Sequence, residues 1–360
     1  GCIRGCRFCQ AGFCYRPVRP KSRDLLIRQG IEACQKSGYQ EMTLSSLSSS
    51  DYRQLEGLCD GLLDYCTPRN INLNLPSLRA DGFSMSIMEK LQRSRKSSIT
   101  FAPEAGTQRL RDAINKNVTE EDLLKSCRTV FEGGCNAVKL YFMLGLPTET
   151  DEDVLGIADL ANKVYLCWRQ YAVSRARGIR ITVSTSFFVP KPFTPFQWEG
   201  QITMEEYQRR VQLLRSAITN KSIIYNWHDP DTSYLEAVFA RGDRRLAPVI
   251  EEAWRQGAKF DSWSEYFDLE RWLTACRTCG VDPDFYATRE RTKDEVLPWS
   301  HISVGVRPAY FWREREQAYK SVITPDCRVQ CMGCGADKLL ECGKCDEALT
   351  RRERAERGEV

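Results

Sequence analysis

Three cysteines at the start of the chain have a spacing that suits metal ligation. The segment GCIRGCRFCQAG places Cys2, Cys6 and Cys9 in a C-x3-C-x2-C pattern, with Phe8 directly before the third thiol. Three thiolates bind three irons of a 4Fe-4S cluster and leave the fourth iron open to a substrate or cofactor, whereas clusters used only for electron transfer have four cysteines. The pattern therefore predicts such a cluster. The alternative is structural zinc with Cys14 as the fourth ligand, although zinc sites usually pair two C-x2-C knuckles.

A second set of cysteines near the C-terminus repeats this spacing. DCRVQCMGC supplies Cys327, Cys331 and Cys334, and Cys342 and Cys345 follow closely. A second iron-sulfur cluster, a zinc knuckle of four thiolates and partly idle thiols are all open interpretations. We assign no role to the C-x2-C pair at 276 and 279. Six further cysteines lie within helix or strand patterns, where packing is the expected role: Cys34, Cys59, Cys66, Cys127, Cys135 and Cys167.

Composition narrows the class of protein. The chain has 360 residues, a net charge of +4, 17 cysteines and only two histidines, so metal chemistry must depend on thiolates. Its hydrophobic content of 42% is that of a globular protein, and no apolar run approaches the roughly 20 residues of a membrane helix. We expect a cytoplasmic protein without a membrane partner. The chain has no leader pattern, so nothing indicates secretion. Because it begins Gly-Cys without Met, we expect that an upstream part is missing.

Strand-like and helical segments alternate over the first 220 residues. Strands are expected at 41–45, 71–77, 98–102, 136–144 and 179–189, and helices between them, with Gly38 ending the first helix and Asp51 and Thr119 as N-caps. This pattern predicts an α/β fold, a partial TIM-like (β/α)6 barrel over residues 1–220 whose first strand is truncated. A mainly helical extension (221–325), a cysteine-rich metal-binding segment (326–346) and a charged tail (347–360) should follow.

With the cysteine motif at the start of this alternation, the sequence resembles the radical S-adenosylmethionine (SAM) superfamily. The segments FAPEAGTQRLRDAINKNVTEEDL, KLYFMLGLPTETDEDV and PWSHISVGV make it similar to an uncharacterised family of radical SAM proteins with a cobalamin-binding domain before the barrel. The resemblance implies SAM and a 4Fe-4S cluster as cofactors. It also suggests cobalamin, bound through an upstream domain that is absent from this chain. Either the chain is a fragment, which the missing first strand favours, or cobalamin is not a cofactor.

The resemblance also suggests SAM-binding residues. Phe8 is expected against the adenine, and Glu104 and Arg109 are expected to contact the polar groups of SAM. Ser46 and Ser48 stand where the superfamily has glycines and a carboxylate that hold the methionyl amine, and hydroxyls can accept from that ammonium group. Gly145, at the exit of a strand, would let the backbone approach the adenine. For each of these residues the alternative is an ordinary role in packing, capping or a turn.

The implied reaction is reductive cleavage of SAM to methionine and a 5'-deoxyadenosyl radical, which abstracts a hydrogen atom from the substrate. An electron donor such as flavodoxin or ferredoxin is an expected partner, and methylation or methylthiolation is the expected outcome by family analogy. Basic residues after the cluster motif could guide an RNA substrate, or could form a solvated loop: Arg16, Arg19, Lys21 and Arg23. The competing class is a non-enzymatic thiolate-metal binding module that contacts nucleic acid.

Overall fold

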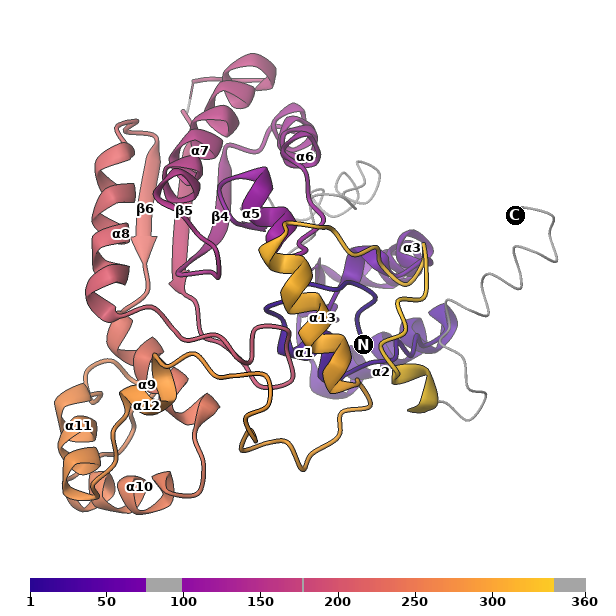
Figure 1. The fold of residues 1–360 in the computed structure, drawn as a ribbon. Coiled ribbons are helices and arrows are strands. Elements are labelled where there is room, and N and C mark those ends of the chain that lie inside the picture. The colour runs from indigo at the N-terminus through magenta and orange to yellow at the C-terminus, as the bar shows by residue number, and fades with distance from the viewer. Residues whose placement is uncertain (76–98, 177, 340–360) are drawn as a thin grey trace.

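The computed structural model describes residues 1–75, 99–176 and 178–339 (Figure 1). Within these ranges the strands form two parallel sheets, one ordered β1-β2 and one ordered β3-β4-β5-β6. Their bounds are β1 Glu41–Thr43, β2 Asn72–Asn74, β3 Ile99–Glu104, β4 Ala137–Leu144, β5 Arg180–Phe187 and β6 Ile223–Trp227. The predicted α/β class with parallel strands is confirmed. The expected helix near 84–95 lies outside the described residues.

Helices separate the successive strands, as parallel pairing requires. β1 is preceded by α2 (Arg23–Ser37) and is followed, before β2, by η1 (Ser49–Asp51), α3 (Leu55–Cys66) and η2 (Thr67–Arg69). β3 is followed by α5 (Gln108–Ala113) and α6 (Glu120–Glu132), β4 by α7 (Asp151–Tyr171), and β5 by α8 (Met204–Ala217). Two predicted helix ends are confirmed. α2 ends at Gly38 in the left-handed conformation, and Thr119 opens α6 with a capping box.

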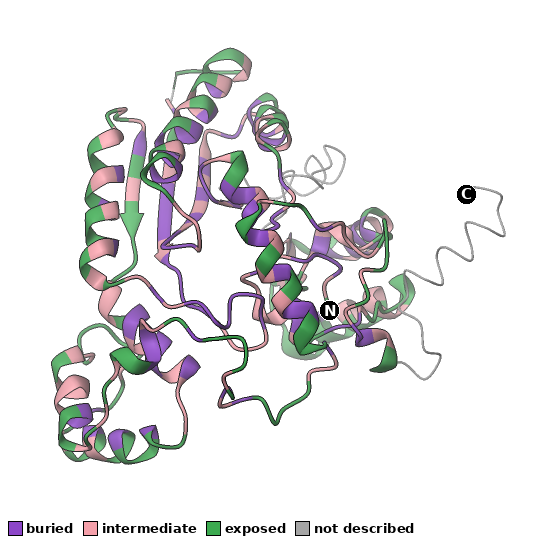
Figure 2. Cartoon of the chain, in the orientation of Figure 1, coloured by how far each residue is buried: buried purple, intermediate pink, exposed green. Residues whose placement is uncertain are grey.

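The main core lies between the larger sheet and helices α6, α7 and α8. Strands β4 and β5 are mostly buried or intermediate, whereas β6 is largely exposed (Figure 2). Every second side chain of β4 is buried, from Val138 through Leu140 and Phe142 to Leu144. β4 pairs with β5 over its full length, so Leu144 lies opposite Phe187. Burying a side chain of this size stabilises the fold by about 1.5–3 kcal/mol. The carboxyl ends of these strands are therefore held at one edge of the sheet.

Two sequence-based expectations need correction. Asp51 does not cap the helix that follows it: it lies in η1, and Gln54 stands at the start of α3. The Asp51 carboxylate instead accepts hydrogen bonds from Arg4 at 2.9 and 2.6 Å. The strand β6 was also not predicted. It is short and largely exposed, so it lacks the apolar alternation that marks β4.

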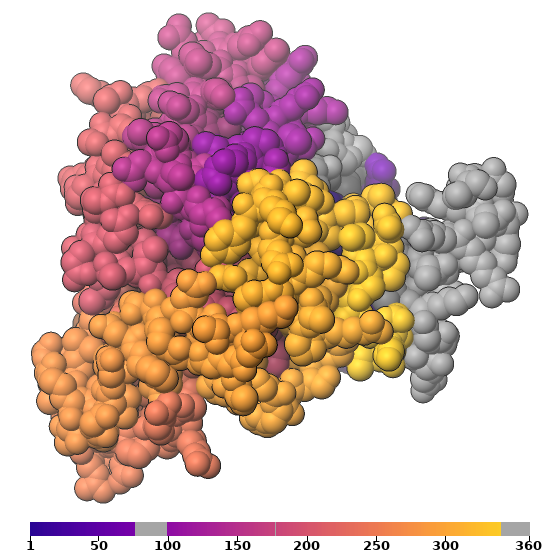
Figure 3. Space-filling model, viewed as in Figure 1, coloured from indigo at the N-terminus to yellow at the C-terminus, as the bar shows by residue number. Residues whose placement is uncertain are grey.

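The C-terminal region is mainly helical, as predicted. Helices α9 to α12 share a separate core and lie together at one end of the molecule (Figure 1), whereas α13 lies beside the N-terminal residues. In Figure 3 the yellow C-terminal residues form the surface at and after α13, away from α9 to α12. The bounds are α9 Pro230–Arg241, α10 Leu246–Arg255, α11 Leu269–Thr278, α12 Asp284–Ala287, α13 Pro308–Tyr319 and η4 Ala336–Leu339. No helix in the described ranges is long and apolar enough to cross a membrane.

Candidate functional site

The three N-terminal cysteines lie on a loop, residues 1–9, that leads into the short helix α1 (Gln10–Cys14). Cys2, Cys6 and Cys9 are all partly exposed. The Cys9 sulfur caps α1 by accepting from the backbone N–H of Gly12 at 3.4 Å. We call residues 1–9 the cluster loop. Sulfur atoms that are neither deeply buried nor freely mobile are suited to metal ligation.

The arginines of the cluster loop are buried, in contrast to its cysteines. Arg7 is fully buried, and its guanidinium pairs with Glu314 of α13 at 3.2 Å and donates to the carbonyl of Ala113 at 2.9 Å. Arg4 pairs with Asp51 at 2.6 Å and with Asp326 at 3.4 Å. These contacts tie the loop to three distant segments of the chain. The arginines of the loop are thus anchored in the protein, whereas its cysteines stay partly exposed.

Asn115 adds a further anchor. Its amide donates to the carbonyls of Gly5 and Thr324, each at 3.1 Å, and its side-chain oxygen accepts from the Thr324 N–H at 2.9 Å. Asn115 has φ +53°, a conformation that Asn tolerates better than most residues. Asn115 therefore joins the cluster loop at Gly5 to the C-terminal segment at Thr324.

The electrostatics of Cys9 indicate that the three thiols lie near one another. Burial raises the pKa of Cys9 to about 11, and the neighbouring Cys6 and Cys2 add to this rise, while the Gly12 N–H and Lys116 oppose it. A metal must displace this proton, because only the thiolate ligates. In the described residues, no three His, Cys, Asp or Glu side chains converge on a single metal position. A 4Fe-4S cube does not require that convergence, since each thiolate binds a different iron.

A charged pair lies beside the cluster loop. Lys116 donates to Glu104 at 3.0 Å, and its ammonium lies 5.9 Å from the centre of the Phe8 ring. Glu104 ends β3 with φ +70°, and Lys116 is largely buried. The structure thus brings together Phe8, Glu104 and Cys9, three of the predicted site residues, around Lys116. Lys116 itself was not predicted as a site residue. Its only signal in the sequence is its place between two asparagines, Asn115 and Asn117, which both have positive φ in the structure.

The two predicted serines make local contacts. The Ser48 hydroxyl donates to Asp51 at 2.5 Å, and the Ser46 hydroxyl lies 2.9 Å from that of Ser49. Since Asp51 also holds Arg4, this serine-rich loop is joined to the cluster loop. A role of Ser46 and Ser48 in binding the methionyl amine remains a prediction.

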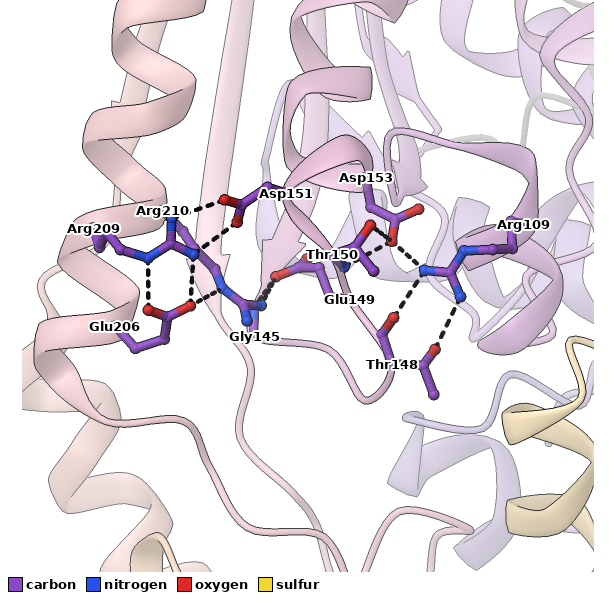
Figure 4. A network of polar contacts seen from close by, with 10 residues as sticks. All are labelled: Arg109, Gly145, Thr148, Glu149, Thr150, Asp151, Asp153, Glu206, Arg209 and Arg210. Carbon is purple, nitrogen blue, oxygen red and sulfur yellow. Dashed lines mark hydrogen bonds and ion pairs between the residues drawn. The ribbon is translucent and has the colours of Figure 1, made fainter.

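Gly145 and Arg109 belong to a polar network at the carboxyl end of β4 (Figure 4). The Gly145 N–H donates to the buried Glu149 carboxylate at 2.7 Å, and Glu149 pairs with Arg210. Arg109 donates to the Thr148 carbonyl at 2.8 Å and pairs with Asp153. The network fixes the β4–α7 turn against α5 and α8. In the structure, Gly145 and Arg109 thus make contacts within the chain. Their role in binding SAM remains a prediction.

The basic segment after the cluster loop divides into buried and exposed parts. Arg16 is buried and donates to the carbonyls of Gly12 and Arg4, each at 2.9 Å, so the expectation that it contacts RNA is wrong. Its planar guanidinium fits the interior because carbonyls satisfy its donors. Arg19 and Lys21 are exposed.

The second cysteine set lies next to the cluster loop, although more than 300 residues separate the two in sequence. The Cys327 N–H donates to the Ile3 carbonyl at 3.5 Å. Cys331 is exposed and Cys327 and Cys334 are partly exposed. Cys342 and Cys345 lie outside the described residues, and Cys276 is buried in the core of α9 to α12.

Comparison with known proteins shows which class the N-terminal part of the chain resembles. Residues 1–161 match the family described as the Radical SAM superfamily. An uncharacterised protein of Methanocaldococcus jannaschii, MJ0966, is 30% identical to this chain over 255 residues. The alignment covers 70% of this chain and 52% of MJ0966, so the chain spans about half the length of this relative. Among solved structures, HydG, a maturase of the [FeFe]-hydrogenase, aligns with 64% of this chain and 51% of its own at 14% identity and a TM-score of 0.38.

Residues 1–161 are therefore similar to the radical SAM superfamily, in agreement with the resemblance of the sequence. Members of that superfamily use an iron-sulfur cluster, S-adenosylmethionine and an external electron donor. The thiol set of the cluster loop fits this cluster chemically, since thiolates are the ligands that iron-sulfur clusters use.

Proposed function

We propose that Cys2, Cys6 and Cys9 hold a 4Fe-4S cluster at which the enzyme cleaves S-adenosylmethionine. One observation carries the proposal: three partly exposed thiols share a loop whose arginines are buried in ion pairs and carbonyl contacts. With SAM bound, such a cluster supplies one electron for reductive cleavage to methionine and a 5'-deoxyadenosyl radical.

The residues around the loop orient the cofactor. Phe8 offers an aromatic face next to Cys9, and the Lys116–Glu104 pair offers one cation and one anion in a partly buried setting. A zwitterionic amino acid group is complementary to such a pair, because charge-assisted hydrogen bonds are strengthened where water is scarce. We therefore assign Lys116 and Glu104 to the recognition of the methionyl part of SAM, together with the predicted Ser46 and Ser48.

Anaerobic reconstitution tests the cluster. Cys6→Ala should abolish the 4Fe-4S absorption of the loop and the formation of 5'-deoxyadenosine from SAM after reduction. Cys14→Ala is the matched control, because Cys14 is also partly exposed and lies only five residues after Cys9 but outside the spacing motif. Cys14→Ala should retain both signals. Loss of a bound zinc in both variants, without SAM cleavage in the parent protein, would instead support the non-enzymatic thiolate-metal module.

For the reaction outcome we propose methylation or methylthiolation of a macromolecular substrate, with RNA as the leading class. Support comes from the family resemblance and from exposed rings at the end of α10 and in the loop that leads to α11, where bases can stack: Trp254, Phe260, Trp263 and Tyr266. Arg19 and Lys21 add exposed positive charge. Binding of tRNA or rRNA that weakens steeply with salt, and weakens further in Trp263→Ala, supports RNA; indifference to both nucleic acids excludes it.

Cobalamin and the electron donor are part of the same proposal. We propose that flavodoxin or ferredoxin supplies the electron in the cytoplasm, and that cobalamin enters through a domain outside this chain. Reconstituted protein should form 5'-deoxyadenosine with reduced flavodoxin alone, whereas product methylation should require added cobalamin. Methylated product in the absence of cobalamin would remove that cofactor from the proposal.

A further inference from the structure

The C-terminal cysteine set packs directly behind the cluster loop. The Cys327 N–H meets the carbonyl of Ile3, the residue after Cys2, and the Arg307 N–H donates to the Cys334 carbonyl at 2.9 Å. By standard backbone dimensions, the Cα atoms of Cys2 and Cys327 are no more than about 11 Å apart. The fold therefore brings two C-x3-C-x2-C sets together from opposite ends of the chain.

A buried cation without a carboxylate partner contacts both segments. Arg16 donates to Gly12 and Arg4 of the N-terminal segment, and no carboxylate of the described ranges forms an ion pair with it. Its other neighbours are the thiols of Cys334 and Cys327 and the rings described below. Arg4, by contrast, is neutralised by acidic side chains.

Aromatic side chains limit the access of water to Arg16. Its guanidinium lies 4.6 Å from the ring centre of Phe13 and 6.0 Å from that of Tyr310, and Phe311 packs edge-on to Phe13 at 5.2 Å. Cys334 packs against the same apolar cluster. A charge removed from water in this way is costly unless an anion lies nearby. Thiolates bound to a metal centre would supply that anion.

We propose that Cys327, Cys331 and Cys334 hold a second iron-sulfur cluster, packed behind the cluster loop, with Arg16 as the buried cation that balances its charge. The inference rests on the proposed function only in that the neighbouring loop holds the first cluster. One observation favours a cluster over zinc: the thiol spacing repeats that of the first set. Zinc held with Cys342 and Cys345 is the alternative outcome of the test.

The test is iron, sulfide and zinc content of the anaerobically reconstituted full chain. The parent should bind about twice the iron and sulfide of Cys331→Ala, and Cys6→Ala should lose the other half. Cys331 is exposed, so its truncation leaves the core intact. Equal iron in parent and Cys331→Ala, or zinc in place of the lost iron, overturns the second cluster. Full iron retention in Cys6→Ala overturns the first cluster instead, so the two failures are distinguishable.

A second measurement isolates the role of Arg16. In the Cys6→Ala protein, which keeps only the second cluster, Arg16→Gln should make its reduction potential more negative, because loss of a nearby positive charge disfavours the added electron. Arg19→Gln is the matched control, since Arg19 is exposed on the same segment. An unchanged potential in Arg16→Gln, with the cluster retained, overturns the charge-balancing role.

Discussion

The buried pair of Arg7 and Glu314 gives a quantitative test of how the cluster loop is anchored. The side chains are 0% and 2% exposed, and the guanidinium contacts the Glu314 carboxylate through Nε at 3.3 Å and Nη2 at 3.2 Å. The Nη2 group also donates to the Val322 carbonyl at 2.8 Å. Desolvation lowers the pKa of Arg7, and the neighbouring Glu314 carboxylate opposes this effect.

Arg7→Met should leave the buried Glu314 carboxylate with only the partly exposed Arg313, 4.0 Å away, as a cation. Breaking a buried pair in this way costs about 3–5 kcal/mol, whereas replacing both partners by apolar side chains is often neutral. With an m-value of about 3 kcal/mol/M, the urea midpoint should fall by about 1–2 M in Arg7→Met and recover largely in Arg7→Met/Glu314→Met. The assay is equilibrium urea unfolding of the reduced, metal-free chain, followed by far-UV circular dichroism.

Arg128→Met is the matched control for this experiment. Arg128 forms an i,i+4 pair with Glu132 on the exposed face of α6, at 2.8 Å, and such pairs contribute only about 0.3–0.5 kcal/mol. A free energy of unfolding for Arg7→Met within 1 kcal/mol of the control would refute the anchoring argument. A double variant as unstable as the single one would show that the carbonyl contacts of Arg7, and not its charge pair, hold the loop.

Three further predictions concern the site. Lys116→Met should weaken SAM binding about 10- to 100-fold through the loss of a charge-assisted hydrogen bond. The control Lys125→Met, at an exposed position of α6, should leave SAM binding unchanged. Equal affinities of the two variants for SAM, measured by calorimetry, would exclude Lys116 from the site. Gly145→Ala should destabilise the chain by about 1–3 kcal/mol, because its φ is +88° and a Cβ would lie 3.0 Å from Ile202. Gly178→Ala, with φ +65° and open space, should cost less; thermal unfolding compares the two. In the metal-free chain, alkylation of Cys9 should be slow at pH 8 and accelerate as the pH rises towards its pKa of about 11. Rapid modification of Cys9 at pH 8, measured by peptide mass spectrometry, would contradict that value.

The fold was largely predictable because its signals are local. Strand β4 shows the apolar pattern of a buried strand, Gly38 ends α2, and Thr119 with Asp122 forms a capping box. β6 escaped prediction because it is short and mostly exposed, so its strand conformation depends on pairing with β5. Local propensity cannot reveal a strand that exists because its neighbour offers unpaired backbone groups.

The surroundings of the site were less predictable, because they depend on contacts across long sequence separations. Asp51 is suited to cap a helix by its type and position, yet it pairs with Arg4 of the cluster loop. Arg16 belongs to a basic stretch that suggests a nucleic-acid contact, yet it is buried. Lys116 carries no motif, and only the turn after α5 brings it to Glu104 and Phe8.

By itself, the sequence determined the resemblance to the radical SAM superfamily, the α/β class and the thiol spacing, because each depends on residues close together along the chain. Tertiary structure alone decided which arginines anchor the cluster loop and that the segment beginning at Cys327 contacts it. The physical reason is that burial turns a charge or a thiol from a solvated group into one that requires a partner. That partner is supplied by whichever segment the fold brings near.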